Sequence, residues 1–247
     1  MESENKRLNK FIADSGYCSR READRLIGEG KVLIDGRVGV LGDRILPGMR
    51  VTVEGVSVTG ESEKVYIALN KPRGIVCTAD PREPMNVVDY IGHPQRIFPV
   101  GRLDKDSEGL LLLTSDGEIV NRILRAAGGH EKEYEVMIDR PVTTEFLQKM
   151  SAGVPILDTV TLPCRIRKTG PRSFNLILVQ GLNRQIRRMC EALGYNVRRL
   201  RRVRINSLRI GNLAPGQWRE LTEGEVAALM ASIAHSSGLP AGAESRT

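Results

Sequence analysis

The chain has 247 residues, 40% of them hydrophobic and 4% aromatic, and its 37 Lys and Arg against 30 Asp and Glu give a net charge of +7. This length suits one domain with a smaller module, and the basic balance favours a polyanionic partner. The four cysteines form no Cys-x-x-Cys pair, which argues against a zinc site or a disulfide framework. No apolar run approaches the ~18 residues of a membrane span or forms a signal core, so we expect a cytoplasmic protein without membrane contact.

Residues 1–54 are predicted to form a small module of two helices followed by a short β unit. Apolar stripes around Leu8 and Leu26 mark the helices, and Ser19 with Glu22 forms a capping box before the second one. Strands are expected at 32–34, 38–40 and 51–53. The pattern resembles the S4 RNA-binding domain, although a solvated pair of basic helices would look similar. The resemblance implies RNA contacts by Arg7, Lys10, Arg20 and Arg21.

Residues 55–63 are polar and predict a linker, and residues 64–235 predict the larger domain. Its strands and helices mix without regular alternation, which predicts the α+β class, with a mixed, largely antiparallel sheet and packed helices. Strands are expected at 65–69, 75–77, 97–100, 110–114, 134–138, 174–179, 197–203 and 218–221. Helices are expected at 118–126, 144–150, 184–193 and 223–234. The small, polar residues 236–247 predict a disordered tail.

The loop 101–109, with the sequence GRLDKDSEG, places Asp104 directly before the apolar strand predicted at 110–114. A strand this apolar enters a core, so the loop is expected at the rim of a cleft. An Asp in a Gly-bounded loop is usually a turn former. A chemical role for Asp104 therefore requires partners elsewhere in the chain.

Residues 181–209 contain nine arginines and one acid, a local net charge of +8. Arginine without lysine suits bidentate contacts with phosphate, although a solvated basic face or a membrane-surface helix would carry the same charge. In the helix predicted at 184–193, Ile186 and Met189 share the apolar face, and the arginines share the other. Its first turn follows a strand, where it can meet RNA phosphate or a carboxylate such as Asp104.

Tyr134 alternates with Val136 and Ile138 in a predicted strand, so its ring is expected to be at least half buried on their face. Ordinary core packing is the common role of such a tyrosine. The functional alternative is a platform on which a base is held.

Taken together, the loop 101–110, the strand that begins Lys132-Glu133-Tyr134 and the segment 181–187 resemble the RsuA-type pseudouridine synthases. The segments at 130–134 and 181–191 look most like the large-subunit ribosomal RNA pseudouridine synthase F branch. The resemblance implies isomerisation of uridine in RNA without a cofactor or a metal. Because a base inside a helix cannot be turned over, the target base must be flipped into the cleft.

The family's catalytic aspartate falls on Asp104, which would attack ribose C1′ or, in the competing account, remove the C2′ proton. Either role needs an ionised carboxylate, and the family's pairing arginine falls on Arg187. The active-site tyrosine falls on Tyr134, which would stack on the uracil and help the C5 proton leave. Arg102 matches the arginine that enters the space vacated by the flipped base. Further RNA contacts are expected at Lys71, Arg73, Arg184, Arg188, Arg198, Arg199, Arg201 and Arg202.

Three other functions are compatible with parts of this pattern. A non-catalytic, ribosome-associated RNA-binding protein needs only the S4-like module and the arginines, but it has no use for a carboxylate facing its ligand. A DNA-repair glycosylase would also flip a base, but it would release free uracil. Phosphoryl transfer is disfavoured, because the Gly-x-x-x-x-Gly-Lys motif is absent. We therefore expect ribosomal RNA as substrate, from the large subunit by branch likeness, with a tRNA stem-loop as a second candidate, and a monomeric protein.

Overall fold

The computed structural model describes residues 5–60, 62–124 and 129–235. The chain divides into two compact units. The first unit spans Met1–Val65, His93–Ile97 and Ser115–Gly117, and the second unit comprises the rest of the chain. The tail expected at 236–247 and the end of the helix expected at 118–126 lie outside the described residues.

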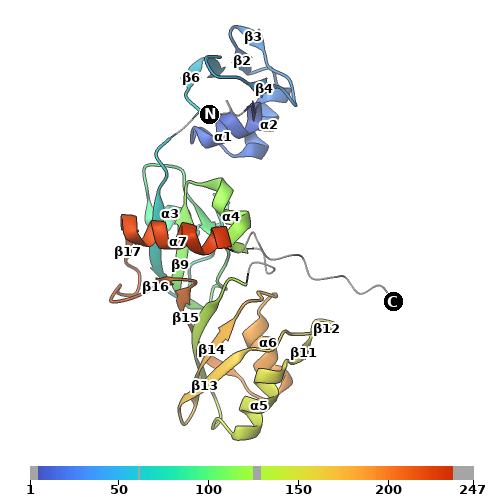
Figure 1. Ribbon diagram of the computed structural model, residues 1–247, viewed down its shortest axis with the longest axis vertical. Helices are drawn as coiled ribbons and strands as arrows, with labels where there is room; N and C mark the ends of the chain where they lie inside the picture. Colours follow the sequence, from blue (N-terminus) through green and yellow to red (C-terminus); the bar gives the residue numbers. More distant parts are fainter. Residues whose placement is uncertain (1–4, 61, 125–128, 236–247) are drawn as a thin grey trace. The chain divides into compact units, whose positions relative to one another are not determined.

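The first unit consists of two helices and two small antiparallel sheets (Figure 1). Its elements are β1 (Lys6–Arg7), α1 (Leu8–Asp14), α2 (Arg20–Gly28), β2 (Val32–Ile34), β3 (Arg37–Val38), β4 (Arg44–Ile45), β5 (Val51–Val53) and β6 (Val56–Val58). Ile12, Ala23 and Val32 are fully buried in the core that joins the helices to the sheet β3-β2-β5-β6. The Ser19 hydroxyl accepts a hydrogen bond from the Glu22 N–H at 3.1 Å, which confirms the predicted cap of α2.

The prediction of a linker at 55–63 is wrong for its first half, because β6 pairs there with β5. Glu54 and Gly55 both have a positive φ, +49° and +82°, as the two central residues of a tight hairpin turn require. Val58 then lies in the core of the unit. The predicted β unit therefore gains a fourth strand beyond residue 54.

The second unit is built on a nine-stranded mixed sheet with the main order β13-β14-β10-β15-β9-β7-β17. Strand β16 pairs with β15, and β8 pairs with β9. The strands are β7 (Tyr66–Lys71), β8 (Phe98–Val100), β9 (Glu108–Thr114), β10 (Lys132–Ile138), β11 (Pro155–Ile156), β12 (Thr159–Val160), β13 (Arg165–Gly170), β14 (Ser173–Leu178), β15 (Val197–Ile205), β16 (Leu208–Arg209) and β17 (Trp218–Glu220). The helices are α3 (Val87–Ile91), α4 (Gly117–Leu124), α5 (Thr144–Ala152), α6 (Gln185–Ala192) and α7 (Glu223–His235).

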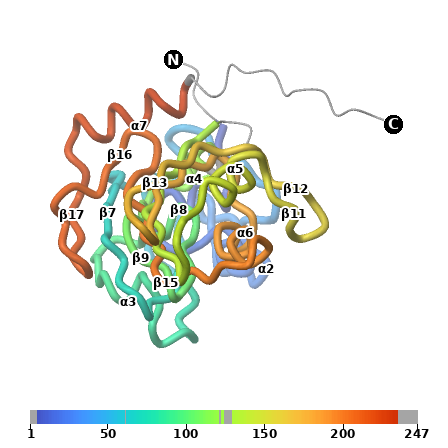
Figure 2. The backbone as a smooth tube through the Cα atoms, turned by 90° about the horizontal axis from the view of Figure 1, so that it is seen from below, coloured from blue at the N-terminus to red at the C-terminus, as the bar shows by residue number. Residues whose placement is uncertain are grey.

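Two apolar cores cover different parts of this sheet. Helices α5 and α6 pack on β10, β14 and β15, and Phe146, Phe174 and Met189 are buried among them. Figure 2 shows both helices on the same side of the unit as the β11–β12 hairpin. Helices α4 and α7 pack through Ile123 and Leu229 on the buried leucines of β9. Between the two cores, β9 and β15 run side by side, and they form a parallel pair in a sheet whose other pairings are antiparallel among the described residues.

The α+β class and the largely antiparallel sheet are confirmed. The strand predicted at 75–77 is wrong, because Val76 forms only an isolated bridge with Asn86. Strand β13 was not predicted, because its sequence RIRKTG lies on an exposed edge of the sheet and lacks the apolar alternation of a half-buried strand. The predicted end of α6 is confirmed by Gly194, whose φ is +83° and whose N–H donates to the Glu191 carbonyl.

Candidate active site

The Asp104 loop connects β8 to β9 at the point where β9 meets β15. Gly109 lies opposite Arg202 in the parallel pair and has a φ of +106°. A Cβ atom at this position would lie 2.2 Å from the Arg202 carbonyl oxygen. Glycine is therefore required for the two backbones to approach, and it brings the carboxylate loop beside the arginine-rich strand.

Lys71, at the end of β7, supports this loop from inside the protein. Its side chain is fully buried, and Nζ donates at 2.8 Å to the carbonyls of Pro72 and Ile75. It also lies 3.5 Å from the Lys105 carbonyl, in the Asp104 loop. Burial lowers the pKa of this ammonium. The expectation that Lys71 binds phosphate is wrong, because the side chain is turned away from solvent and ties two loops together.

Asp104 faces two arginines of the segment around α6. Arg184 Nη1 lies 3.8 Å from Asp104 Oδ2, and Arg187 Nε lies 3.9 Å from the same oxygen. Both distances are too long for hydrogen bonds, so the interaction is one of charge. Two positive charges this close attract a carboxylate anion, so the arrangement suits an aspartate that acts as an anion.

Arg187 is held in place by the loop that it faces. Its Nη2 donates at 3.3 Å to the Asp106 carbonyl and to the Ser107 hydroxyl, and its side chain is only 11% exposed. Burial lowers the pKa of this guanidinium, and the neighbouring Arg184 adds to the effect, while Asp104 opposes it. Ser107 is itself buried and was not singled out by sequence reasoning.

A cleft of about 680 Å³ opens beside these residues, within the size range of ligand pockets. Asp104 and Arg184 line it from one side, and Tyr134 lines it from β10. Tyr134 is half buried and packs against the core of α5 and α6. Among the described residues that line the cleft, Asp104 is the one carboxylate, and the basic side chains are Arg102, Lys132, Arg184 and Arg202.

The structure therefore brings Asp104, Tyr134 and Arg184 to one cleft, with Arg187 behind the carboxylate. Arg102 is exposed and lines the same cleft. Arg188 is not directed into it, because its guanidinium donates to the backbone and side-chain oxygens of Asn183. Gln185 was not predicted, yet it is buried and accepts a hydrogen bond from the Leu182 N–H, which shapes the turn before α6.

The remaining arginines of the basic segment differ in exposure and pairing. Arg198 is exposed, and its carbonyl accepts a hydrogen bond from Arg73 at 3.0 Å. Arg199 is exposed and bonded to Glu108, and Arg201 is half buried and lies 3.3 Å from Glu135. These glutamates come from neighbouring strands and reduce the local charge that the sequence predicts.

Arg202, which the sequence predicts as an RNA contact, does not lie at the surface. It is 3% exposed, and its Nε donates to the Leu110 carbonyl at 2.7 Å. It reaches the cleft from inside the sheet. Lys132, two residues before Tyr134 and on the same face of β10, also lines the cleft and was not predicted as a site residue.

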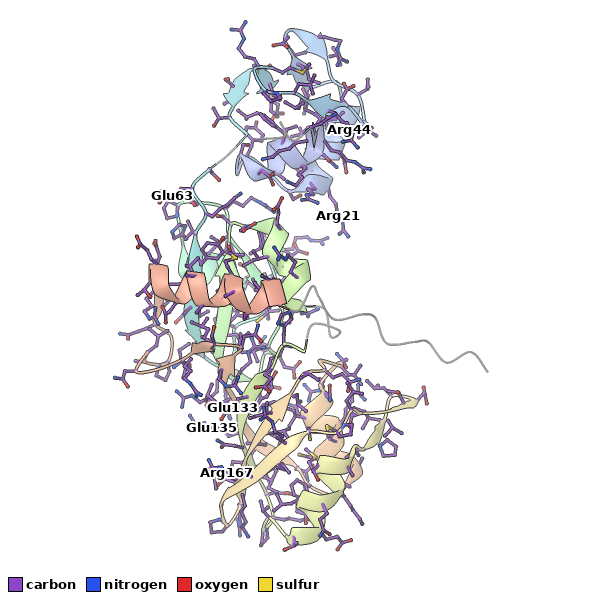
Figure 3. The ribbon with its side chains drawn as sticks, viewed as in Figure 1. Arg21, Arg44, Glu63, Glu133, Glu135 and Arg167 are labelled. Atoms are coloured by element: carbon purple, nitrogen blue, oxygen red, sulfur yellow. The ribbon has the colours of Figure 1, made fainter. Side chains whose placement is uncertain are left out.

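In the first unit, three of the four predicted RNA contacts are exposed: Arg7, Arg20 and Arg21, the last of which is labelled in Figure 3. Lys10 is half buried and is engaged by Asp14 at 3.0 Å. Arg44 is exposed on β4, is labelled beside the helices in Figure 3, and was not predicted. Across the described ranges, no group of three His, Cys, Asp or Glu is placed to hold a metal ion. No helix within those ranges is long and apolar enough to cross a membrane.

A basic cleft that holds one carboxylate between arginines and a half-buried tyrosine is typical of an enzyme acting on a polyanion. The model of the RNA pseudouridylate synthase family matches residues 65–192, and that of the S4 domain matches residues 6–54. The chain belongs to the RNA pseudouridylate synthase family and carries an S4 domain; it is an RNA pseudouridine synthase, an isomerase.

Relatives cover almost the whole chain. The dual-specificity RNA pseudouridine synthase RluF of Escherichia coli is 52% identical over 94% of this chain and 80% of its own length. The ribosomal large subunit pseudouridine synthase B of Bacillus subtilis is 38% identical over 93% of this chain and 97% of its own. A crystal structure of a pseudouridylate synthase superposes with a TM-score of 0.66 at 30% identity, over 91% of this chain and 99% of that one.

Proposed function

We propose that this chain converts a specific uridine of large-subunit ribosomal RNA to pseudouridine, with Asp104 acting at the ribose. The observation that carries the proposal is the carboxylate of Asp104 in a basic cleft, 3.8 and 3.9 Å from two guanidinium groups. A protein that only binds RNA gains nothing from an anion there, because it repels phosphate. The Bacillus subtilis relative, which is named for the ribosomal large subunit, supports the substrate class.

In this mechanism the target uridine is flipped out of its stack into the cleft. Asp104 then attacks C1′ or removes the C2′ proton, and the bond between C1′ and N1 breaks. Arg187, held by Ser107 and the Asp106 carbonyl, lies beside the carboxylate and holds it in position. Tyr134 faces the uracil while the ring turns and is reattached through C5. Arg102, exposed at the cleft, fills the space that the base leaves in the RNA.

Exposed arginines of the S4 domain, Arg7, Arg20 and Arg21, are proposed to hold the RNA outside the cleft, together with Arg73, Arg184 and Arg198. Arg199 and Arg201 are not included, because Glu108 and Glu135 pair with them. Binding by several phosphate contacts releases counterions, so affinity should fall steeply with salt. A bacterial ribosomal RNA substrate places the work in the cytoplasm, and we expect the protein to act as a monomer.

The test compares Asp104→Asn with Asp106→Asn, a matched change two residues away at an exposed position. Pseudouridines are mapped in ribosomal RNA and tRNA from cells that contain no synthase of this kind except the wild-type chain or one variant. We expect the product with the wild type and Asp106→Asn and none with Asp104→Asn, whose RNA affinity stays within about threefold. Activity in Asp104→Asn would overturn the role of this aspartate, and release of free uracil would indicate a glycosylase.

The tRNA arm of the same experiment addresses a second substrate. The E. coli relative is named a dual-specificity RNA pseudouridine synthase, so a tRNA stem-loop is a specific candidate. A pseudouridine that appears in tRNA together with the one in ribosomal RNA, and is lost in Asp104→Asn, would establish that both RNAs enter one site.

A further inference from the structure

The inner wall of the cleft carries two cations that no carboxylate balances. Arg202 is 3% exposed and uses Nε to hold the Leu110 carbonyl. Its Nη2 is buried, and among the described residues it has no hydrogen-bond partner. A buried guanidinium with an unused donor is costly for folding, so its position requires a reason outside the folded protein alone.

Lys132 lies on the neighbouring strand β10, two residues from Tyr134, which is the residue that pairs with Arg202. Its Nζ donates to the His130 carbonyl at 3.2 Å, and neither Lys132 nor Arg202 forms an ion pair with any described residue. Burial and the charge of Arg202 lower the pKa of the Lys132 amine to about 8. Two like charges that are held together at the wall of a cleft, without a carboxylate between them, form a site for an anion.

The strand register decides which part of an RNA reaches this site. Tyr134 pairs directly with Arg202 across β10 and β15, and Lys132 is two residues from Tyr134 on the same face. Asp104 and the exposed Arg184 lie on another wall of the cleft. The phosphates belong to the continuous RNA chain and stay near the exposed arginines. Only the flipped base extends far enough into the cleft to reach Arg202, which is 3% exposed.

We propose that Lys132 and Arg202 bind the uracil ring through its carbonyl oxygens and stabilise the negative charge that forms on it when the glycosidic bond breaks. This inference rests on the function proposed above. It adds two catalytic residues whose task differs from that of Asp104.

The chemistry of the step requires such a site in both accounts of Asp104. When the C1′–N1 bond breaks, its electron pair stays with N1, and the ring becomes a uracil anion with charge on N1 and both carbonyl oxygens. C1′ is left bonded to Asp104, or the sugar is left as a glycal after its C2′ proton has moved to Asp104. C5 of the ring then forms a bond to C1′. In the first account this releases the carboxylate of Asp104, and in the second account Asp104 returns the proton to C2′. C5 finally loses its proton, and N1 gains one. Cations fixed where charge develops are an efficient form of transition-state stabilisation.

The experiment measures single-turnover pseudouridine formation on 23S ribosomal RNA labelled with [5-³H]uridine, at saturating protein, together with RNA affinity by filter binding. Lys132→Met and Arg202→Met are each expected to lower the saturated rate by about 100-fold, with the Kd within threefold of the wild type. Arg202→Lys keeps the charge and should recover at least tenfold of the loss in Arg202→Met. Arg167→Met, which removes an exposed arginine from the other face of the same sheet, is the matched control and should leave the rate unchanged.

A second arm changes the leaving group. RNA that carries 5-fluorouridine offers a ring that is a better anion, because fluorine withdraws electrons from it. If the two cations stabilise the leaving ring, Lys132→Met should slow the disappearance of 5-fluorouridine much less than that of uridine. The factor by which the rate falls should be at least tenfold smaller for 5-fluorouridine. A role of Lys132 in packing alone would give equal losses.

Two results would overturn the inference. A Kd raised at least tenfold with an unchanged saturated rate would show that the pair binds backbone phosphate. An unchanged rate and Kd in Lys132→Met, while Asp104→Asn is inactive, would refute the role of the cations and leave the proposed function intact. If Arg202→Met fails to fold, Lys132→Met decides the test. Lys132 is only partly buried, whereas Arg202 is buried and its hydrogen bond to the Leu110 carbonyl contributes to the fold.

Discussion

The two faces of the strand pair β10–β15 use the same residue types in opposite ways. On the outer face, Arg201 and Arg204 meet Glu135 and Glu133 across the strands, at 3.3 and 2.9 Å. On the inner face, Arg202 and Lys132 meet no carboxylate among the described residues and line the cleft. Figure 3 shows Glu133, Glu135 and Arg167 together on the lower part of the sheet.

This difference teaches that a count of charge does not measure the capacity to bind RNA. The arginines of 181–209 are alike in sequence, but cross-strand glutamates neutralise the outer ones. Lys132 and Arg202 on the inner face are not neutralised, and burying their charges lowers the stability of the folded protein. Such a loss of stability is typical of functional sites. Four predictions follow from the contrast between a structural outer face and a functional inner one.

The largest effect is expected for Arg187, which holds the carboxylate at the cleft. Arg187→Met removes the buried cation next to Asp104 and the hydrogen bonds to the Asp106 carbonyl and Ser107. We expect the single-turnover rate to fall by about 10³-fold, as for other groups that stabilise charge at a reaction centre. Arg188→Met, one residue further on and bonded to Asn183, is the control and should retain the rate. Equal losses in both would mean that the helix, and not the charge, had been disturbed.

The second effect is a pH dependence at the inner face. Because the pKa of Lys132 is about 8, its amine is charged below this pH and neutral above it. We expect the charged form to be the active one. The rate at subsaturating protein should therefore fall as pH rises above 8, with a slope that approaches a tenfold decrease per pH unit. Lys132→Arg, which stays charged, should be flat over this range. A profile that is the same in both proteins would assign the titration to another group.

The third effect concerns stability and the outer face. Arg204 is 11% exposed and bridges Glu133 and Glu131, so Arg204→Met leaves Glu133 without its ion pair, while Glu131 keeps its pairing with Arg165. We expect the free energy of unfolding to fall by about 2 kcal/mol at pH 7, with the rate per folded molecule unchanged. The hydrogen bond from Arg204 lowers the pKa of Glu133, so the pair stabilises the protein above the normal pKa of glutamate. The difference between the proteins should therefore shrink as pH falls below the normal pKa of glutamate and through that lowered pKa, which a series of denaturant titrations from pH 7 downwards will test.

The smallest effect has the opposite sign. Folding places the Lys132 ammonium in a site that lowers its pKa from 10.5 to about 8, so the charged amine destabilises the folded state below pH 8. Lys132→Met should raise the free energy of unfolding by about 1 kcal/mol at pH 7. This is a net value, because the substitution also removes the hydrogen bond to the His130 carbonyl. The gain should fade as pH rises through 8, because the wild-type amine then loses its proton on folding. If Lys132→Met is instead less stable than the wild type at pH 7, Lys132 stabilises the fold, as the paired arginines of the outer face do.

Patterns within short stretches of sequence predicted much of this protein. Ser19 caps its helix, Gly194 ends another, and the apolar run after the Asp104 loop forms the buried strand β9. The alternation in β10 placed Tyr134 correctly on the inner face. The linker prediction failed at β6 because three residues with one buried valine form a strand only when a partner strand is beside them.

Sequence alone therefore determined the local elements, the family and the residues of the carboxylate loop, because caps, periodicity and motifs depend on neighbours a few positions apart. It could not assign Lys71, whose hydrogen bonds reach a loop 34 residues away, or separate Arg202 from Arg201. Only the tertiary structure decided which cations are paired, since the glutamates that neutralise them lie on other strands, 66 and 71 residues distant for Arg201 and Arg204. Burial and partner charge are long-range properties, and they distinguish an arginine that stabilises the sheet from one that is available to the substrate.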